Sequence, residues 1–198
     1  MPLIQMSVNV VLMYLQKVLN KSKQSGAADR SAFCIRRKMM MPILALIFVA
    51  AEVAADQIIK QLVIQFLLPV GTRTLIPGFL SLDYLENRGA AFGIFQNCQW
   101  LIALITAVIC VVITLVLFRY QHHNMLSWVA CTLILGGGIG NIIDRVVRGY
   151  VIDFIHFHFF PYIFNFADIC VVIGVILLVL HLFLSDCAEE KKAEEKNA

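Results

Sequence analysis

The sequence predicts an all-α membrane protein, with four transmembrane helices and a small extracytoplasmic β-rich segment between the first and second spans. Composition is the first reason, because the 198 residues are 60% hydrophobic and 15% charged. A soluble domain has about 25% charged residues. The second reason is a series of long apolar runs, the clearest of which can cross a bilayer. The length fits one small domain.

Four runs predict the four spans. Residues 41–62 form the first, and they include three charged side chains. Residues 100–118 and 126–143 form the second and third, and neither contains a charge. Residues 169–184 form the fourth, which reaches spanning length only when Asp168 is included.

Basic residues predict the orientation of the spans. They gather in the N-terminal flank, the loop after the second span and the tail, which share one side of the membrane (Arg30, Arg36, Arg37, Lys38, Arg119, Lys191, Lys192 and Lys196). Lys and Arg favour the cytoplasmic side. Both termini are therefore predicted to be cytoplasmic. The segments 61–99 and 144–165 then face the extracytoplasmic side.

Three regions follow from this arrangement: an N-terminal cytoplasmic extension (1–40), a four-span domain (41–186) and a charged cytoplasmic tail (187–198). Two interpretations of the extension remain open. It forms an amphipathic surface helix, or translation starts later, at one of the methionines before the first span. Within the four-span domain, residues 72–84 are rich in Thr, Leu, Ile, Phe and Tyr around a Pro-Gly pair, which predicts short strands on the outer membrane surface.

Composition also excludes several classes of function. The net charge of +3, without a block of basic and aromatic residues, does not indicate a nucleic-acid partner. The six cysteines include no CxxC pair, so neither a redox motif nor a zinc site is indicated.

Three charged residues of the first span share one helix face. Glu52, Asp56 and Lys60 are spaced i, i+4, i+8, so Asp56 and Lys60 can pair. One interpretation is a structural ion pair that points into the bundle. The alternative is that Lys60 also meets a loop or a substrate group near the outer interface.

A glycine-rich run in the third span precedes a set of polar residues. It lacks Gly-Lys-Ser/Thr, so it is not a phosphate loop. Gly136 and Gly140 form a GxxxG spacing that lets a neighbouring helix approach closely. Asn141, Asp144 and Arg145 follow at the outer end of the span. They either cap a packed helix end or hold a substrate backbone and orient a catalytic loop.

Two aspartates lie beside apolar runs, where a carboxylate is costly and usually has a task. Asp153 is expected in a loop after Gly149 and among apolar neighbours, which favour its neutral form. Asp168 begins the fourth span, where a helix N-terminus favours the anionic form, and Asn165 is a good cap. Two such settings suit one acid and one base. The alternative is two unrelated aspartates at helix ends.

Other chemistries fit less well. His156 and His158 could join the two aspartates in a metal site, but the alternating pattern of residues 156–160 favours an interfacial strand with aromatic residues. The serines near the membrane segments, such as Ser81 and Ser127, lack a GxSxG context or a Lys close in sequence. A proton-coupled transporter is a further class, although no internal repeat supports it.

With these residues assembled, the chain resembles the lipoprotein signal peptidases (signal peptidase II), a family of bacterial membrane aspartyl proteases. Residues 56–60 are similar to the family's DQxxK, and residues 86–93 to its ENxGAAFG. Residues 140–145 and 149–154 resemble GNxxDR and GxVxDF, and residues 164–168 resemble FNxAD.

The resemblance implies that Asp153 and Asp168 are a catalytic dyad that needs neither a metal nor an organic cofactor. It also implies a set of substrate-binding or supporting residues: Asp56, Lys60, Asn87, Gly89, Asn141, Asp144, Arg145 and Asn165. The implied activity is that of an aspartic endopeptidase. It would remove signal peptides from diacylglyceryl-modified prolipoproteins by cutting on the amino side of the lipidated cysteine.

The family also implies a location and partners. A multi-pass protein of the bacterial cytoplasmic membrane is expected, with its active site toward the extracytoplasmic face. That agrees with the orientation obtained from Lys and Arg. The expected partners are lipidated prolipoproteins and membrane lipid, and the expected state is a monomer.

Overall fold

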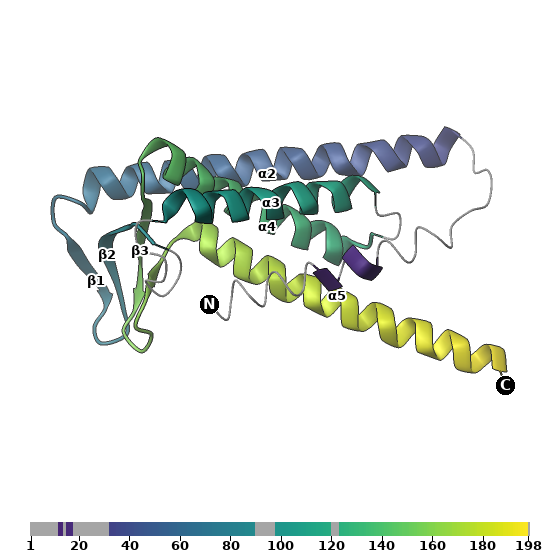
Figure 1. The fold of residues 1–198 in the computed structure, drawn as a ribbon. Coiled ribbons are helices and arrows are strands. Elements are labelled where there is room, and N and C mark those ends of the chain that lie inside the picture. The colour runs from purple at the N-terminus through teal and green to yellow at the C-terminus, as the bar shows by residue number, and fades with distance from the viewer. Residues whose placement is uncertain (1–11, 14, 18–31, 90–97, 120–122, 198) are drawn as a thin grey trace.

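The computed structural model describes residues 12–13, 15–17, 32–89, 98–119 and 123–197. The main elements, in chain order, are α2 (Ala32–Phe66), β1 (Thr72–Ile76), β2 (Leu80–Asn87), α3 (Gln99–Arg119), α4 (Met125–Val147), β3 (Val151–Phe157), β4 (Ile163–Phe164) and α5 (Phe166–Asn197). The helices form an elongated bundle, and the strands gather at one end of it (Figure 1).

The four predicted spans are confirmed. Four helices of the described chain are long and apolar enough to cross a membrane: Met41–Phe66, Gln99–Arg119, Met125–Val147 and Phe166–Ser185. Each contains its predicted run. The third span begins where Asn124 caps it, because the Asn124 side chain accepts a hydrogen bond of 2.9 Å from the backbone N–H of Ser127. The last helix continues past its span through the tail to Asn197.

Helix α4 is the centre of the bundle and contacts the three other long helices. Its glycines explain how these helices come so close. Gly136 and Gly140 face Glu52 and Asp56 of α2, as the GxxxG spacing predicts. Between them lie Gly137, which faces the backbone of α5, and Gly138, which faces Cys110 of α3. A side chain at Gly137 would push α5 away, and one at Gly136 or Gly140 would displace the carboxyl end of Glu52 or Asp56.

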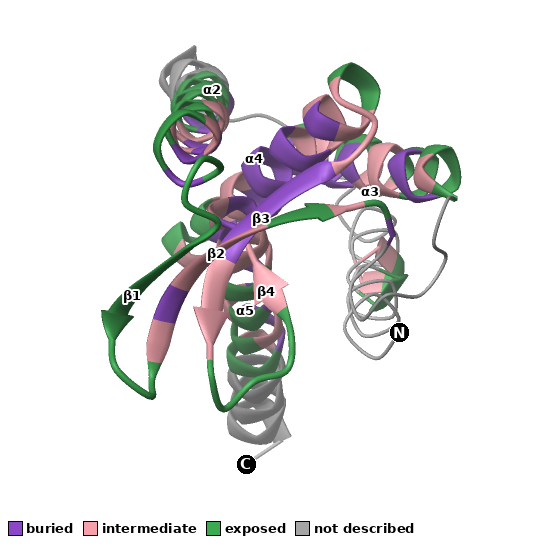
Figure 2. Cartoon of the chain, turned by 90° about the vertical axis from the view of Figure 1, so that its left-hand side faces the viewer, coloured by how far each residue is buried: buried purple, intermediate pink, exposed green. Residues whose placement is uncertain are grey.

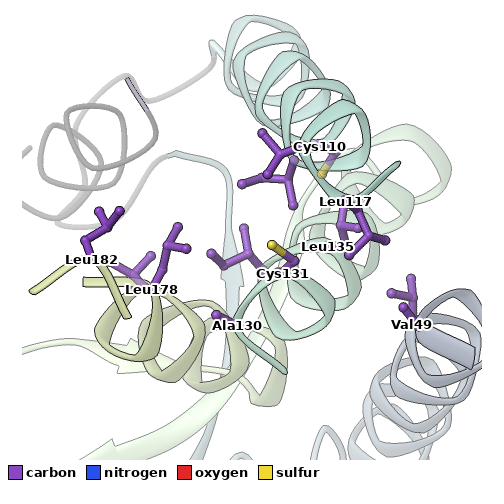
Figure 3. Close-up of a cluster of buried hydrophobic side chains, with 13 residues drawn as sticks. Val49, Cys110, Leu117, Ala130, Cys131, Leu135, Leu178 and Leu182 are labelled. Carbon is purple, nitrogen blue, oxygen red and sulfur yellow. The ribbon is translucent and has the colours of Figure 1, made fainter. Parts of the chain in front are cut away.

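Apolar side chains fill the half of the bundle that lies away from the strands. Cys110 and Leu117 of α3, Cys131 and Leu135 of α4, and Leu178 of α5 meet in this cluster (Figure 3). Close packing of these aliphatic groups, together with backbone hydrogen bonds inside each helix, holds helices together where no water competes.

The sheet has four antiparallel strands in the order β1-β2-β3-β4. The β1–β2 hairpin turns at the Pro77-Gly78 pair, and Gly78 has a φ of 71° that favours glycine. This part is the predicted β-rich segment. The other two strands lie between the third and fourth spans, so the sheet joins two loops that are far apart in the sequence.

The expected loop around Asp153 is wrong, because Asp153 lies in the middle of β3. Residues 151–157 are rich in β-branched and aromatic side chains, which favour a strand. The deciding factor is the free edge of β2, which supplies a hydrogen-bonding partner. Gly149, with a φ of 78°, ends α4 and turns the chain into β3.

A second apolar cluster attaches the sheet to the bundle. Val63 and Leu67 at the end of α2 pack with Ile152 and Phe154 of β3. The buried half of β3 is the half that lies against the helices, while β1 is exposed along its length (Figure 2). The strand β3 is therefore packed against the helices at its beginning, while its end is held between β2 and β4.

We predict that alanine is tolerated at Gly136 but destabilises the fold at the adjacent Gly137. A methyl group at position 137 would meet the carbonyl oxygen of Ala167, a backbone atom that moves only with α5. Gly137→Ala is expected to lower the free energy of unfolding by about 1–3 kcal/mol. Gly136→Ala meets only the mobile carboxyl end of Glu52, so its cost should be small. Unfolding in detergent micelles measures both variants, and equal losses would contradict the assignment of these two helix contacts.

Candidate active site

A buried lysine organises the polar end of the bundle. Lys60 of α2 is 0% exposed, and its Nζ lies 2.8 Å from Asp56 Oδ2 and 2.8 Å from Asp144 Oδ2. The same ammonium group donates to Asn141 Oδ1 at 3.0 Å. An ammonium has three donors, and each has an acceptor here. The predicted Asp56–Lys60 pair is therefore confirmed, and it reaches two residues of α4.

Asp144 joins α4 to its surroundings on both sides. Its Oδ1 accepts hydrogen bonds from Gln57 Nε2 (3.1 Å) and from the guanidinium of Arg148. The backbone N–H of Ile152 approaches its Oδ2 at 3.4 Å. Asp144 thus connects the beginning of β3 to Lys60, and Ile152 immediately precedes Asp153.

Two asparagines connect this ion cluster to both aspartates. Asn141 accepts from Lys60 and donates through Nδ2 to Asp168 Oδ1 at 2.8 Å. Asn165 is fully buried, and its Nδ2 donates to Asp153 Oδ1 at 2.6 Å and to Asn141 Oδ1 at 3.2 Å. Asp153 and Asp168, which are 15 positions apart in the sequence, therefore belong to one hydrogen-bonded network. The interpretation as unrelated helix-end aspartates is wrong.

Asn165 also begins α5 in the way that the sequence predicts. Its side-chain Oδ1 accepts from the backbone N–H of Asp168 at 2.9 Å, and Asp168 Oδ2 accepts from the backbone N–H of Asn165 at 3.2 Å. This reciprocal pattern is a capping box. It fixes the Asp168 carboxylate at the helix N-terminus, where the helix dipole favours a negative charge.

Asp153 occupies the more enclosed position. It is 1% exposed, and its Oδ2 accepts from Asn87 Nδ2 at 2.8 Å. Burial raises the pKa of Asp153 to about 7, and the neighbouring charge of Asp168 acts in the same direction. The hydrogen bonds from Asn87 and Asn165 oppose this shift without cancelling it. Asp153 can therefore hold a proton at neutral pH, as its apolar sequence context predicts.

A bulge in β2 lies next to this carboxyl group. Leu82 pairs with Ile155 and Leu85 pairs with Asp153, so β2 has one more residue than β3 in this interval. Bulges bend a strand and redirect its side chains, and they are common beside active sites. Here the bend precedes Asn87, which meets Asp153 from the end of β2.

Arg145 supplies a partly unused cation to the same site. Its Nη1 donates to the carbonyl oxygen of Asn141 at 3.1 Å, and its charge acts on both aspartates. Its Nε is buried and has no hydrogen-bond partner among the described residues. A buried donor without a partner is costly, so this group is available for an oxygen atom of a ligand.

Gly89 and the two histidines are the remaining candidate residues from the sequence analysis. Gly89 is buried, and its backbone N–H donates to Asn87 Oδ1 at 2.9 Å, which orients the Asn87 amide toward Asp153. Residues 90–93 of the same motif lie outside the described residues.

The two histidines do not join Asp153 and Asp168: His156 pairs with Asp83, and His158 pairs with Ser81 at 3.0 Å. The described residues thus do not bring together the four-residue metal site considered above.

Sequence reasoning missed two supporting residues, Gln57 and Arg148. The amide of Gln57 lies within 3.2 Å of Asp56, Gly140 and Asp144, and its Oε1 accepts from Arg148 at 3.1 Å. Arg148 also pairs with Asp144, one turn earlier in α4. The i, i+4 spacing of Asp144 and Arg148 was a usable signal. Gln57 also had a usable signal, because it belongs to the DQxxK motif and lies three positions before Lys60 on the same helix.

Comparisons with known proteins show which family the chain is similar to. The sequence profile of the family described as signal peptidase (SPase) II matches residues 47–184. A lipoprotein signal peptidase of Caldanaerobacter subterraneus subsp. tengcongensis is 43% identical over 135 residues, which cover 68% of this chain and 92% of that protein. One of Streptococcus agalactiae serotype Ia is 40% identical over 151 residues, covering 74% and 94% respectively.

Solved structures give the same result. A bacterial membrane enzyme determined by the in meso method at 2.3 Å resolution superposes with a TM-score of 0.66 and 33% identity, covering 74% of this chain and 90% of that one. A second, at 1.9 Å resolution, has a TM-score of 0.62 and 33% identity, covering 70% and 92%. The site residues described above, apart from Gln57 and Arg148, were expected from the sequence, and all of them lie within the matched region.

We predict that Asp153→Asn becomes more stable relative to the unsubstituted protein as the pH rises from about 4 to about 7. Between the usual pKa of 3.8 and the raised value of about 7, the folded chain keeps a proton that the unfolded chain has lost. This group then lowers the free energy of unfolding by about 1.4 kcal/mol for each pH unit in that window. Asparagine does not titrate, so the free energy of unfolding of the variant does not fall in this way as the pH rises. Unfolding midpoints across this pH range measure the difference.

Asp83→Asn is the matched control. Burial acts to raise the pKa of Asp83, but hydrogen bonds from His156, Ser81 and Thr72 outweigh it and hold the pKa below its usual value. Asp83 therefore stabilises the fold above its unfolded pKa, and that contribution is lost as the pH falls through its lower folded pKa. Relative to the unsubstituted protein, Asp83→Asn should be destabilised at neutral pH, and this difference should shrink only in acid, below the unfolded pKa of Asp83. The same pH trend in both variants would contradict the raised pKa of Asp153.

Proposed function

The chain belongs to the signal peptidase II family, whose function is to remove signal peptides from prolipoproteins, and we propose that Asp153 and Asp168 perform this cleavage. The observation that supports the proposal most strongly is the path from Asp153 through Asn165 and Asn141 to Asp168. Two carboxyl groups in one network can share a proton, which is the requirement of an aspartic protease.

The environments of the two carboxyl groups suggest their resting states. Asp153 is buried on the sheet and has a pKa of about 7, so it carries the shared proton. Asp168 is partly exposed, lies at a helix N-terminus and accepts two hydrogen bonds, so we assign it the role of the base that activates the water. Arg145 balances part of this negative charge.

Hydrolysis follows from this arrangement. Asp168 removes a proton from a water molecule as the water oxygen attacks the scissile carbonyl carbon. Asp153 gives its proton to the carbonyl oxygen, which produces a tetrahedral diol. When the carbon–nitrogen bond breaks, the amine leaves with the proton that Asp168 holds. Asp153 recovers a proton from the diol hydroxyl as the new carboxyl group forms, and the starting state returns.

We assign substrate binding to groups around Asp153 and Asp168 whose hydrogen-bonding capacity is not filled. The buried Nε of Arg145 can donate to a carbonyl oxygen of the bound peptide. Asn87 is half-buried at the end of β2, where an extended peptide could lie beside the strand. All of these residues come from one chain, which is consistent with a monomer. Lipidation of the substrate cysteine suits a site that lies at the end of apolar helices.

Membrane orientation is the second part of the proposal. The asymmetry of Lys and Arg supports an orientation with the sheet and both aspartates on the extracytoplasmic side of the bacterial cytoplasmic membrane and both termini in the cytoplasm. The signal peptide of a translocated prolipoprotein would reach the aspartates on that side.

We expect Asp153→Asn and Asp168→Asn to abolish cleavage of a diacylglyceryl-modified prolipoprotein by the purified full chain. Each variant removes one of the two groups that exchange protons, so turnover should fall by at least about 100-fold. The assay includes a chelator, and cleavage before the lipidated cysteine is read by mass spectrometry. Asp83→Asn, which changes an aspartate of the outer sheet paired with His156, should retain activity. Turnover by either dyad variant, or loss of wild-type activity in the chelator, would refute the mechanism.

We also expect Cys98 to react with a membrane-impermeant maleimide added to intact cells. Cys98 is exposed just before α3, at the sheet end of the bundle, whereas Cys110, Cys131 and Cys170 are buried. Labelling should disappear in Cys98→Ser. Labelling of Cys98 only after the cells are permeabilised would reverse the proposed orientation.

A further inference from the structure

A shallow apolar groove lies between the end of α2 and the sheet. Its volume is about 250 Å³, and it is lined by the last turns of α2, by the β1–β2 hairpin and by one residue of β3. The lining residues that matter here are Leu62, Val63, Phe66, Arg73, Leu82 and Phe154. Arg73 is the one charged residue among those that line it.

This groove is separate from the active site. Phe154 follows Asp153 on β3, and successive side chains of a strand point to opposite faces. Asp153 meets Asn87 and Asn165, while Phe154 packs on Val63 and its neighbours in the second apolar cluster. None of the groups that line the groove belongs to the network around the two aspartates. The groove therefore lies behind the strand that carries Asp153.

The position of the groove predicts what kind of molecule reaches it. Leu62 is 48% exposed and Phe66 is 65% exposed, on the part of α2 that ends its membrane span. These side chains face the hydrocarbon of the bilayer, so an acyl chain can enter from the side. Beyond Phe66 the chain leaves the span and forms β1, which places Arg73 at the level of the lipid headgroups.

The charge of Arg73 selects among lipids. Its side chain is exposed and lies opposite Leu82 in the sheet register. It makes no ion pair with any carboxylate in the described part of the chain, in contrast to Arg88, which pairs with Glu86 at 3.2 Å. A guanidinium binds a phosphate through two parallel hydrogen bonds. A zwitterionic lipid offsets its phosphate with its own ammonium group, whereas an anionic phospholipid presents a net negative charge to this cation, and a free phosphate would leave the apolar walls unused.

We propose that the groove binds one anionic phospholipid of the surrounding bilayer, with an acyl chain against Val63 and Phe154 and the phosphate on Arg73. The acyl chain completes the open side of the second apolar cluster. It thereby supports β3 from behind, on the face opposite to Asp153. The proposed orientation assigns this lipid to the outer leaflet, but the binding itself does not depend on the orientation.

The test is native mass spectrometry of the full chain in detergent, with added phosphatidylglycerol or with phosphatidylcholine of the same acyl chains. The protein should retain one phosphatidylglycerol in preference to phosphatidylcholine. Arg73→Gln removes the phosphate contact and should weaken this binding about tenfold. Leu62→Trp fills the groove at an exposed position and should weaken binding of the same lipid. Arg88→Gln removes another exposed arginine of the sheet end and should bind normally.

Three results would overturn the proposal: equal retention of the two lipids, normal binding by Arg73→Gln, or displacement of phosphatidylglycerol by a diacylglyceryl-modified peptide. The last result would make the groove a site for the substrate's own lipid. Asp153→Asn should bind phosphatidylglycerol as the unsubstituted protein does. Failure of the lipid proposal can therefore be distinguished from failure of the proposed catalytic function.

Discussion

The ammonium group of Lys60 is the interaction on which the polar half of this protein depends. Burial of a charge among apolar helices is costly unless its partners are well placed. Here two carboxylates and one amide oxygen take its three hydrogens. Asp144 then holds the beginning of β3, and Asn141 holds Asp168. One cation of the first span thus positions both aspartates, Asp153 and Asp168, although Lys60 makes no hydrogen bond to either of them.

Helix α4 can contribute to this network from both sides because it has glycines where it faces α2 and α5. Close approach by α2 places Lys60 within reach of Asn141 and Asp144. Close approach by α5 places Asp168 beside the same asparagine. In soluble proteins glycines weaken a helix, but in a bilayer the backbone hydrogen bonds have no competitor, and close packing outweighs the propensity cost. The bundle is therefore tight where the polar residues lie.

The strand β3 separates two environments. One face presents Asp153 to the asparagines and to Asp168, and the other packs Phe154 on the end of α2. The enclosed position that raises the pKa of Asp153 also makes its ionised form costly to the fold. Stability and proton transfer are thus coupled through the same carboxyl group, as is common where a site needs an acid at neutral pH.

The sequence by itself determined the four spans, the hairpin at Pro77-Gly78, the cap at Asn165 and the pairing of Asp56 with Lys60, because each depends on residues within a few positions of one another. Only the tertiary structure decided that Asp153 lies on a strand, that its carboxyl group joins that of Asp168, and that Gln57 and Arg148 support Asp144. These features need partners from distant segments: β3 requires the edge of β2, and the aspartate network requires α4 and α5 to meet. Hydropathy and helical spacing report which face of a segment is apolar, but they do not report which other segment will cover it.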